Sequence, residues 1–206
     1  MIFEVDTPHG AARVHLRGVG APVGALVLGH GAGGGVEAPD LVATTRAAHT
    51  ADFSVALVEQ PYRVAGRRSQ APAAQLDSSW LAVTAHLREG VLRDLPLVVG
   101  GRSAGARVAC RTAAPAGAVA VLCLAFPLHP PGRADDPAKS RLGELDAVRL
   151  PVLVVQGERD AFGIPPGGPR REVVLVPGGH SLKTAAPIEA AVADWLPTTL
   201  ALGVGA

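Results

Sequence analysis

Short apolar runs alternate with amphipathic stretches along almost the whole chain. The runs are rich in Val, Leu and Ala, and they span residues 24–29, 53–59, 95–101, 117–126, 150–157 and 171–178. A strand that is covered on both faces of a parallel sheet has this continuous apolar pattern. The sequence therefore predicts about six parallel strands.

The stretches between these runs carry the period of a helix. Leu76, Trp80, Val83 and Leu87 recur at spacings of four, three and four within residues 73–89. Side chains at these spacings share one face of a helix. Further helices are expected over residues 38–50, 102–114 and 188–195. Strands that alternate with helices imply β–α–β crossovers and an α/β fold.

The first 17 residues follow a different pattern. Residues 2–5 and 12–17 are short β-rich runs on either side of TPHG, which predicts an antiparallel hairpin. No interior linker or repeat divides the rest, and 206 residues are enough for one sizeable core. We expect a single domain over residues 1–206, with helices on both faces of the sheet and no cap domain. Residues 201–206 are expected to be frayed.

Composition removes several classes of function. Nineteen basic and eighteen acidic residues leave a net charge of +1, so no overall field attracts nucleic acid or an anionic membrane. The longest apolar run is about half of the ~20 residues that a membrane helix needs. The N-terminus has no basic segment of the kind that begins a signal peptide.

The number and spacing of the cysteines exclude two further kinds of structure. Cys110 and Cys123 are too few for a disulfide framework and too far apart for a metal-binding pair motif. Cys123 lies in an apolar run and is expected as a buried thiol. We expect a cytoplasmic protein with no metal, no cofactor, and no nucleic acid or membrane partner. The oligomeric state is left open.

Gly101–Gly105 has the pattern G-x-S-x-G and lies between a predicted strand and a predicted helix. A serine at such a turn adopts a strained backbone conformation that pushes its hydroxyl out from the end of the sheet. The flanking glycines let the strand and the helix pack closely. Ser103 is therefore a candidate nucleophile, and the alternative is an ordinary helix N-cap serine.

A second glycine-rich segment, HGAGGG, follows the strand predicted over residues 24–29. Backbone N–H groups in such a loop stabilise an oxyanion together with the N–H of the residue after the nucleophile. We expect the amides of Ala32 and Ala104 to form an oxyanion hole, with Gly33 as the substitute for Ala32.

The same loop has a competing interpretation. Gly29, Gly31 and Gly34 fit the G-x-G-x-x-G of a dinucleotide-binding protein, and Glu59 ends the next strand, where a ribose-binding acid belongs. Glu59 lies 25 residues after Gly34, whereas about 20 is usual. This Rossmann alternative explains none of the later motifs.

Two polar residues follow later strands. Asp160 comes after the run at 150–157, and His180 lies in the PGGH loop after the run at 171–178. The chain order Ser103, Asp160, His180, each after its own strand, is that of the α/β-hydrolase fold. We expect these three to form a catalytic triad. The alternatives are a turn aspartate, with Glu158 as the nearest substitute for the acid, and an inert loop histidine.

The chain resembles the testis-expressed-protein-thirty family, whose relatives include the hydrolase-like domain of an NSL histone acetyltransferase complex subunit. Dienelactone-hydrolase-like proteins are more distant relatives. The resemblance covers about residues 23–195, and its most specific segments are EQPYRVAGRR and FPLHPPG. It implies an α/β-hydrolase fold with Ser103, Asp160 and His180 as nucleophile, acid and histidine, although some relatives act as scaffolds. Ala104 and Ala106 stand where the family pattern GKSMGGR has Met and Gly.

Several residues near these motifs are candidates for contacting a substrate. His30 lies in the glycine-rich loop, and Tyr62, Arg63 and Arg67 follow a strand end, where ligands of α/β sheets bind. The arginines, with their neighbour Arg68, could bind an anionic group. The alternatives are that these arginines pair with the carboxylates of Glu59, Asp135 or Asp136, or that they are simply solvated.

The Pro-rich segment over residues 127–140 is too short to be a lid domain, which indicates an open site for a small or exposed acyl group. The sequence thus predicts a serine hydrolase that cleaves a small-molecule ester or thioester through an acyl-enzyme on Ser103. The first alternative is a non-catalytic binding or scaffold module with the same fold, and the second is the Rossmann protein. The substrate is left open.

Overall fold

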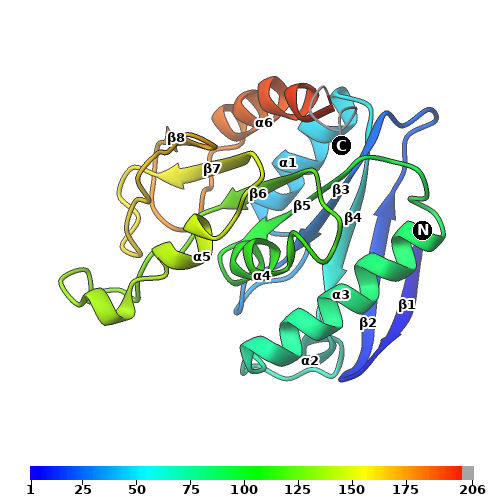
Figure 1. Cartoon of the computed structure of the whole chain (residues 1–206), viewed down its shortest axis with the longest axis horizontal. Helices are drawn as coiled ribbons and strands as arrows, with labels where there is room; N and C mark the ends of the chain where they lie inside the picture. Colours follow the sequence, from blue (N-terminus) through cyan, green and yellow to red (C-terminus); the bar gives the residue numbers. More distant parts are fainter. Residues whose placement is uncertain (201–206) are drawn as a thin grey trace.

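The computed structural model describes residues 1–200, so the fraying expected for residues 201–206 lies outside the described residues. One eight-stranded sheet forms the centre, with the order β1-β2-β4-β3-β5-β6-β7-β8 (Figure 1). Its strands are β1 (Ile2–Thr7), β2 (Gly10–Arg17), β3 (Gly24–Gly29), β4 (Phe53–Glu59), β5 (Leu97–Arg102), β6 (Ala120–Leu124), β7 (Val152–Gly157) and β8 (Arg171–Val176).

The pairing of the strands follows their hydrophobic pattern. β1 and β2 form the predicted antiparallel hairpin, and β2 pairs antiparallel with β4. From β4 across to β8, all neighbours are parallel. Every residue of β3, β6 and β7 is buried, because helices cover both faces of these strands. The prediction of six parallel strands after a hairpin is confirmed.

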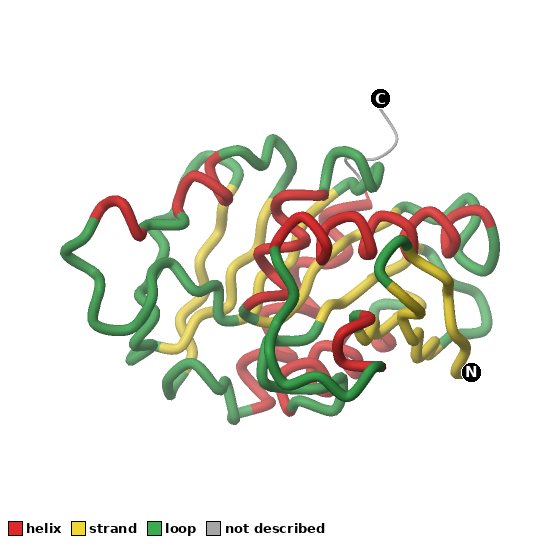
Figure 2. The backbone as a smooth tube through the Cα atoms, turned by 90° about the horizontal axis from the view of Figure 1, so that it is seen from below, coloured by secondary structure: helices red, strands yellow, loops and turns green. Residues whose placement is uncertain are grey.

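The helices form two layers around the sheet (Figures 1 and 2). α1 and α6 pack on one face with one apolar cluster, and α3 and α4 pack on the other face with a second cluster. The long helices are α1 (Pro39–Thr50), α3 (Ala73–Glu89), α4 (Ala104–Thr112) and α6 (Ala185–Leu200). Within residues 1–200, no helix is both long and apolar enough to span a bilayer.

Three short helical segments were not expected from the sequence. α2 (Pro61–Val64), a 3-10 turn (Pro137–Lys139) and α5 (Leu142–Asp146) lie in stretches that were expected as loops or left unassigned. Each has five residues or fewer, so none shows a helical hydrophobic period. α2 begins at a proline, whose fixed φ suits the first turn of a helix.

The two cysteines lie face to face beneath α4. Cys110 on α4 and Cys123 on β6 are both free and buried, and their sulfur atoms are 3.5 Å apart. The hydrogen bond from Cys110, together with burial, raises the pKa of the Cys123 thiol well above its ordinary range. The expectation that Cys123 is a buried thiol is confirmed.

Candidate active site

Ser103 lies at the sharp turn between β5 and α4. Its backbone has φ 52° and ψ −109°, a conformation with positive φ that non-glycine residues rarely adopt. The Ser103 N–H donates to the carbonyl oxygen of Leu124 at 2.8 Å, which ties the turn to the end of β6. Such strain persists only where the surrounding structure enforces it, and it is found at functional sites.

The turn is possible because strand and helix touch through glycine. A Cβ atom on Gly101 would lie 2.6 Å from the carbonyl oxygen of Gly29, and one on Gly105 would collide with the same oxygen. Ala106, the next residue of α4, is completely buried. The close packing that the G-x-S-x-G pattern predicts is therefore present, and it directs the Ser103 side chain to the carboxyl edge of the sheet.

Ser103, His180 and Asp160 form one hydrogen-bonded chain. His180 Nε2 lies 2.9 Å from Ser103 Oγ, and His180 Nδ1 lies 2.9 Å and 3.1 Å from the two Asp160 carboxylate oxygens. A carboxylate only accepts hydrogen bonds, so Nδ1 carries the proton and Nε2 accepts from the serine hydroxyl. The Asp160 side chain has no exposed surface, whereas the His180 side chain is 20% exposed.

Two residues that the sequence did not single out hold this chain in place. Gln156 on β7 donates from Nε2 to Asp160 at 2.8 Å, and the Phe162 N–H donates to the same carboxylate at 2.8 Å. The Phe162 ring stacks on His180 with centroids 4.0 Å apart. Gln156 is the one polar residue in the buried run of β7, a signal that could have identified it. Phe162 has no comparable signal.

The candidate oxyanion hole lies at the start of α4, beside the glycine-rich loop. Ala104 is the first residue of α4, where backbone N–H groups have no partner within the helix and carry its positive end. The loop turns through a bond from the Gly34 N–H to the Gly31 carbonyl, and Tyr62 Oη donates to the Ala32 carbonyl at 3.2 Å. Gly33 is exposed in this turn.

His30 supports the loop instead of offering a free nitrogen. Its Nε2 accepts from the Gln60 N–H at 3.1 Å, so its Nδ1 carries the proton and donates to the Gly31 carbonyl at 2.8 Å. The side chain is buried, and burial lowers the pKa of His30 below its ordinary 6.5. Both ring nitrogens are thus committed to the backbone, so His30 has no free nitrogen for a hydrogen bond to a substrate, but its side chain lines the small cavity against Ala104.

Tyr62 and Arg67 line a cavity of about 310 Å³ between α2, α3 and the hairpin turn. A second, much smaller cavity, about 10 Å³, lies against Ala104 and is also lined by Tyr62. Arg63 is half-buried and lines neither of them, and Arg68 is exposed. Within residues 1–200, no ion pair joins these arginines to a carboxylate. Two of the carboxylates that could have paired with these arginines are bonded to other residues, Glu59 to His15 and Asp136 to Arg133.

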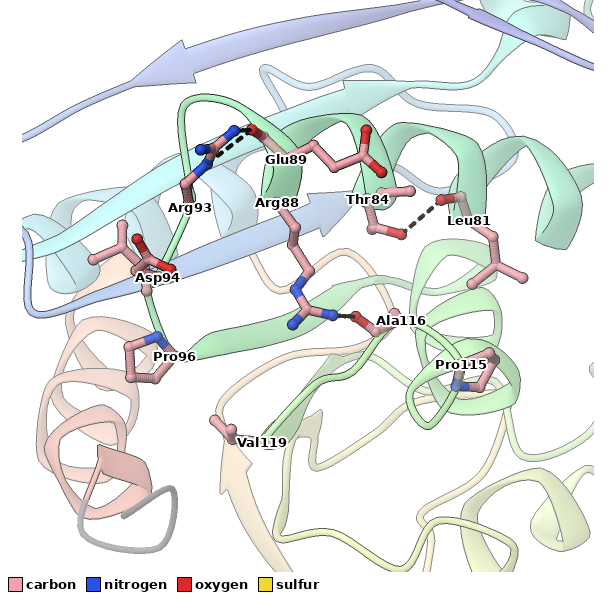
Figure 3. Close-up of a pocket in the computed structure, with 12 residues that line it drawn as sticks. Leu81, Thr84, Arg88, Glu89, Arg93, Asp94, Pro96, Pro115, Ala116 and Val119 are labelled. Atoms are coloured by element: carbon pink, nitrogen blue, oxygen red, sulfur yellow. Dashed lines mark hydrogen bonds between the residues drawn. The ribbon is translucent and has the colours of Figure 1, made fainter. Parts of the chain in front are cut away.

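A larger cavity of about 740 Å³ lies away from these residues (Figure 3). It is lined by Arg88 and Glu89 at the end of α3, by Pro96 before β5 and by Val119 before β6. Residues that precede parallel strands lie at the amino edge of the sheet, whereas Ser103 follows β5 at the carboxyl edge. This cavity is therefore separate from the candidate active site.

The structure does not fit the dinucleotide alternative. After Gly34 the chain takes five more residues to reach α1, so no helix begins at the glycine-rich loop. The Glu59 carboxylate is held by His15 at 2.9 Å. A phosphate-binding turn needs a helix N-terminus directly after the glycines, and a ribose-binding acid needs a free carboxylate.

The strand order, with serine, aspartate and histidine after β5, β7 and β8, defines an α/β-hydrolase fold. The chain belongs to the family described as the alpha/beta hydrolase domain, whose model matches residues 22–167. The matched segment contains Ser103 and Asp160 and ends before His180. No curated protein matches the sequence. Membership of this family supports a hydrolase activity for the chain.

Solved structures with this fold cover nearly the whole chain. An α/β serine hydrolase without a lid from Xanthomonas campestris is 20% identical, with 96% and 95% of the two chains covered and a TM-score of 0.74. Est1E from Butyrivibrio proteoclasticus is 14% identical, with 97% and 99% covered and a TM-score of 0.77. Dienelactone hydrolase from Anabaena variabilis is 17% identical, with 96% of each chain covered and a TM-score of 0.74. At these identities the likeness shows the fold.

Proposed function

We propose that the protein is a serine hydrolase that cleaves a carboxylic ester or thioester through an acyl-enzyme on Ser103. The observation that carries the proposal is the unbroken hydrogen-bonded chain from Ser103 Oγ through His180 to the buried Asp160. Asp160 holds the imidazole in the tautomer that accepts the serine proton and stabilises the imidazolium that forms.

The reaction follows from this arrangement. His180 Nε2 takes the hydroxyl proton as Ser103 Oγ attacks the acyl carbon. His180 then gives the proton to the departing alcohol or thiol, which leaves the acyl group on Ser103. A water molecule releases the acid in a second round, in which His180 again serves as the base.

The oxyanion of each tetrahedral intermediate would be bound by the amides of Ala104 and Ala32, or of Gly33 in place of Ala32. Ala104 is adjacent to the nucleophile, and its N–H is at the positive end of α4. The bond from Tyr62 to the Ala32 carbonyl fixes the orientation of the loop peptides before substrate binds. Fixed donors of this kind are worth about 10²–10³ in rate.

The surroundings favour a short acyl group. The cavity against Ala104 is about 10 Å³, which is too small to enclose a long acyl chain. The segment from Pro127 to Ser140 contains only a three-residue 3-10 turn, so no lid domain is built there. Arg67 and Tyr62 at the neighbouring cavity are suited to a substrate whose remote end is anionic.

Within the α/β hydrolases, we propose that the chain is related to the testis-expressed-protein-thirty proteins. The two specific segments of that resemblance both reach the site. EQPYRVAGRR contains Tyr62, which bonds the glycine-rich loop, and FPLHPPG contains His129, whose N–H donates to the Phe162 carbonyl at 3.0 Å. The free, buried cysteines fit a cytoplasmic protein.

The non-catalytic alternative predicts no reactive serine. A binding module of this fold has no need for positive φ at Ser103 or for a fully buried carboxylate beneath His180, and both carry a free-energy cost. Both features are present, so the catalytic reading is preferred.

The test is covalent labelling by a fluorophosphonate probe, with the wild type beside Ser103→Ala. We expect the wild type to be labelled and the variant to be unlabelled, at melting temperatures within a few degrees of each other. Short-chain esters and thioesters would then be screened for turnover. Absence of labelling in the folded wild type, or equal labelling of the variant, would exclude the acyl-enzyme on Ser103.

A further inference from the structure

The side chain directly before the candidate nucleophile connects three separate segments of the site. Arg102 is the last residue of β5, and its side chain is only 16% exposed. Its Nε lies 2.8 Å from Oδ2 of Asp40, whose side chain is fully buried in the first turn of α1. Its Nη2 donates to the carbonyl oxygen of His180 at 3.1 Å.

The glycine-rich loop packs over the same guanidinium group. A Cβ atom on Gly31 would lie 2.7 Å from Nη1 of Arg102. α1 follows this loop in the chain, so the pair with Asp40 also anchors the loop at its far end. Burial raises the pKa of Asp40 and the charge of Arg102 opposes that shift, so each charge depends on the other to remain in the interior.

These contacts fix a part of the histidine that the triad does not. Asp160 holds the edge of the imidazole at Nδ1, but the distance from Nε2 to Ser103 also depends on where the main chain of residue 180 lies. Because Arg102 and Ser103 are consecutive, the bond from Arg102 holds the main chain of His180 at a fixed distance from the backbone of the nucleophile. A displacement of about 1 Å in such an arrangement can cost about 10² in rate.

We propose that Arg102 is a positioning residue, which acts through its ion pair with Asp40 and its bond to the His180 carbonyl to keep His180 and the glycine-rich loop in reach of Ser103. The inference rests on the proposed function. The guanidinium is bonded to Asp40 and to the His180 carbonyl, so its loss should lower kcat and the rate of serine labelling while leaving KM unchanged.

The test compares Arg102→Met, Arg102→Lys and Asp40→Asn with a matched control. The control is Arg111→Met, because Arg111 also makes two contacts, with Asp77 at 2.8 Å and with Glu144 at 3.2 Å, and its side chain is 20% exposed. These ion pairs join α4 to α3 and to α5, and neither involves a residue of the site. The readouts are the fluorophosphonate labelling rate, kcat and KM for p-nitrophenyl acetate, and thermal stability.

We expect Arg102→Met and Asp40→Asn to be labelled at least about tenfold more slowly than the wild type, at unchanged KM. Lysine keeps the charge but cannot form the two-armed contact, so Arg102→Lys should recover part of the rate. Arg111→Met should react like the wild type. If Arg102→Met does not fold, the lysine and asparagine variants decide the question. Labelling within twofold of the wild type, or an equal loss in Arg111→Met, would overturn the proposal.

A second readout separates this proposal from the proposed function. The proton between His180 Nδ1 and Asp160 gives a far-downfield proton NMR signal when the imidazole is held in place. If the wild type is not labelled, the serine hydrolase proposal fails, and the NMR signal then decides the role of Arg102. Its loss in Arg102→Met and retention in Arg111→Met would support positioning, whereas retention in both would overturn it.

Discussion

Phe162 lies flat against His180, with ring centroids 4.0 Å apart and an angle of 29° between the planes. The backbone N–H of Phe162 also donates to Asp160 at 2.8 Å, so one residue contacts both partners of the candidate nucleophile. The imidazole is thereby held at its edge by the carboxylate and on its face by the phenyl ring. Only the Nε2 side remains for Ser103.

Replacing this ring tests its contribution. Phe162→Leu keeps the backbone bond to Asp160 but removes the stacking, which is worth about 0.5–1.5 kcal/mol for aromatic pairs. We expect kcat to fall about three- to tenfold with KM unchanged. Phe3→Leu is the control, because the Phe3 ring lies beside His86, with ring centroids 6.1 Å apart, far from the site. An equal effect of the two substitutions would contradict the role of the stack.

Asp160→Asn should remove most of the activity without unfolding the protein. An amide offers an N–H as well as an oxygen, so it no longer enforces the tautomer in which Nε2 accepts the serine proton. A fall of about 10³–10⁴ in kcat is expected. The exposed Glu158 lies two residues earlier, and Glu158→Gln should retain full activity. Steady-state kinetics on both variants would check this.

The close contact of Gly101 and Gly105 with the Gly29 carbonyl should not tolerate an added methyl group. Gly101→Ala would place Cβ 2.6 Å from the Gly29 carbonyl oxygen, and overpacking of this kind costs about 1–3 kcal/mol or more. The space around Gly34 is open, so Gly34→Ala should change stability by no more than about 0.5 kcal/mol. Urea denaturation of the two variants measures the difference. Equal stabilities would contradict the packing described above.

Stability should fall on mild acidification because of His30. Burial lowers the pKa of His30 from 6.5, so near and below this pH the unfolded chain binds a proton that the folded chain excludes. The stabilisation is therefore present above pH 6.5 and is lost as the pH falls toward the lowered value, by up to ~1.4 kcal/mol per pH unit. His30→Gln should flatten this slope in denaturation experiments. His9→Gln, at an exposed histidine of the hairpin turn, should leave the slope as in the wild type.

Two adjacent arginines allow a controlled test of substrate charge. Arg67 lines the cavity beside Tyr62, whereas Arg68 does not. Arg67→Gln should lower kcat/KM for esters with a carboxylate at the remote end by about tenfold, since charge-assisted bonds are worth about 1.5–3 kcal/mol when formed. Neutral esters should be unaffected, and Arg68→Gln should behave like the wild type. If both variants lose kcat/KM equally, the effect comes from the overall positive charge of this loop and not from a contact with Arg67.

The sequence predicted the sheet well because its signal is local. β3, β4 and α3 begin and end at the predicted residues, since β3 and β4 are continuous apolar runs and α3 has a consistent helical period. The order of Ser103, Asp160 and His180 also follows from the chain alone, because each residue comes directly after a strand.

The supports of the site could not be predicted in the same way. Arg102 pairs with Asp40, and Phe162 stacks on His180. Both contacts join segments that are separated along the chain, so no local pattern predicts them. His30 is expected to contact the substrate; the fold bonds both of its ring nitrogens to backbone groups and leaves its side chain at the wall of the small cavity against Ala104. A glycine-rich loop indicates where backbone amides are available, but it does not show which of its side chains face inward.

The buried contact between Cys110 and Cys123 has a practical consequence. The chain contains only these two thiols. Cys123 is fully buried, and Cys110 is 5% exposed at the wall of a cavity of about 440 Å³ between α4 and α5. A cysteine placed by mutation on the surface, for example in the loop between Pro127 and Ser140, would be far more exposed than either of them and would react with a maleimide first. The wild-type sequence can therefore carry a fluorophore or spin label at one chosen position without first replacing its own cysteines.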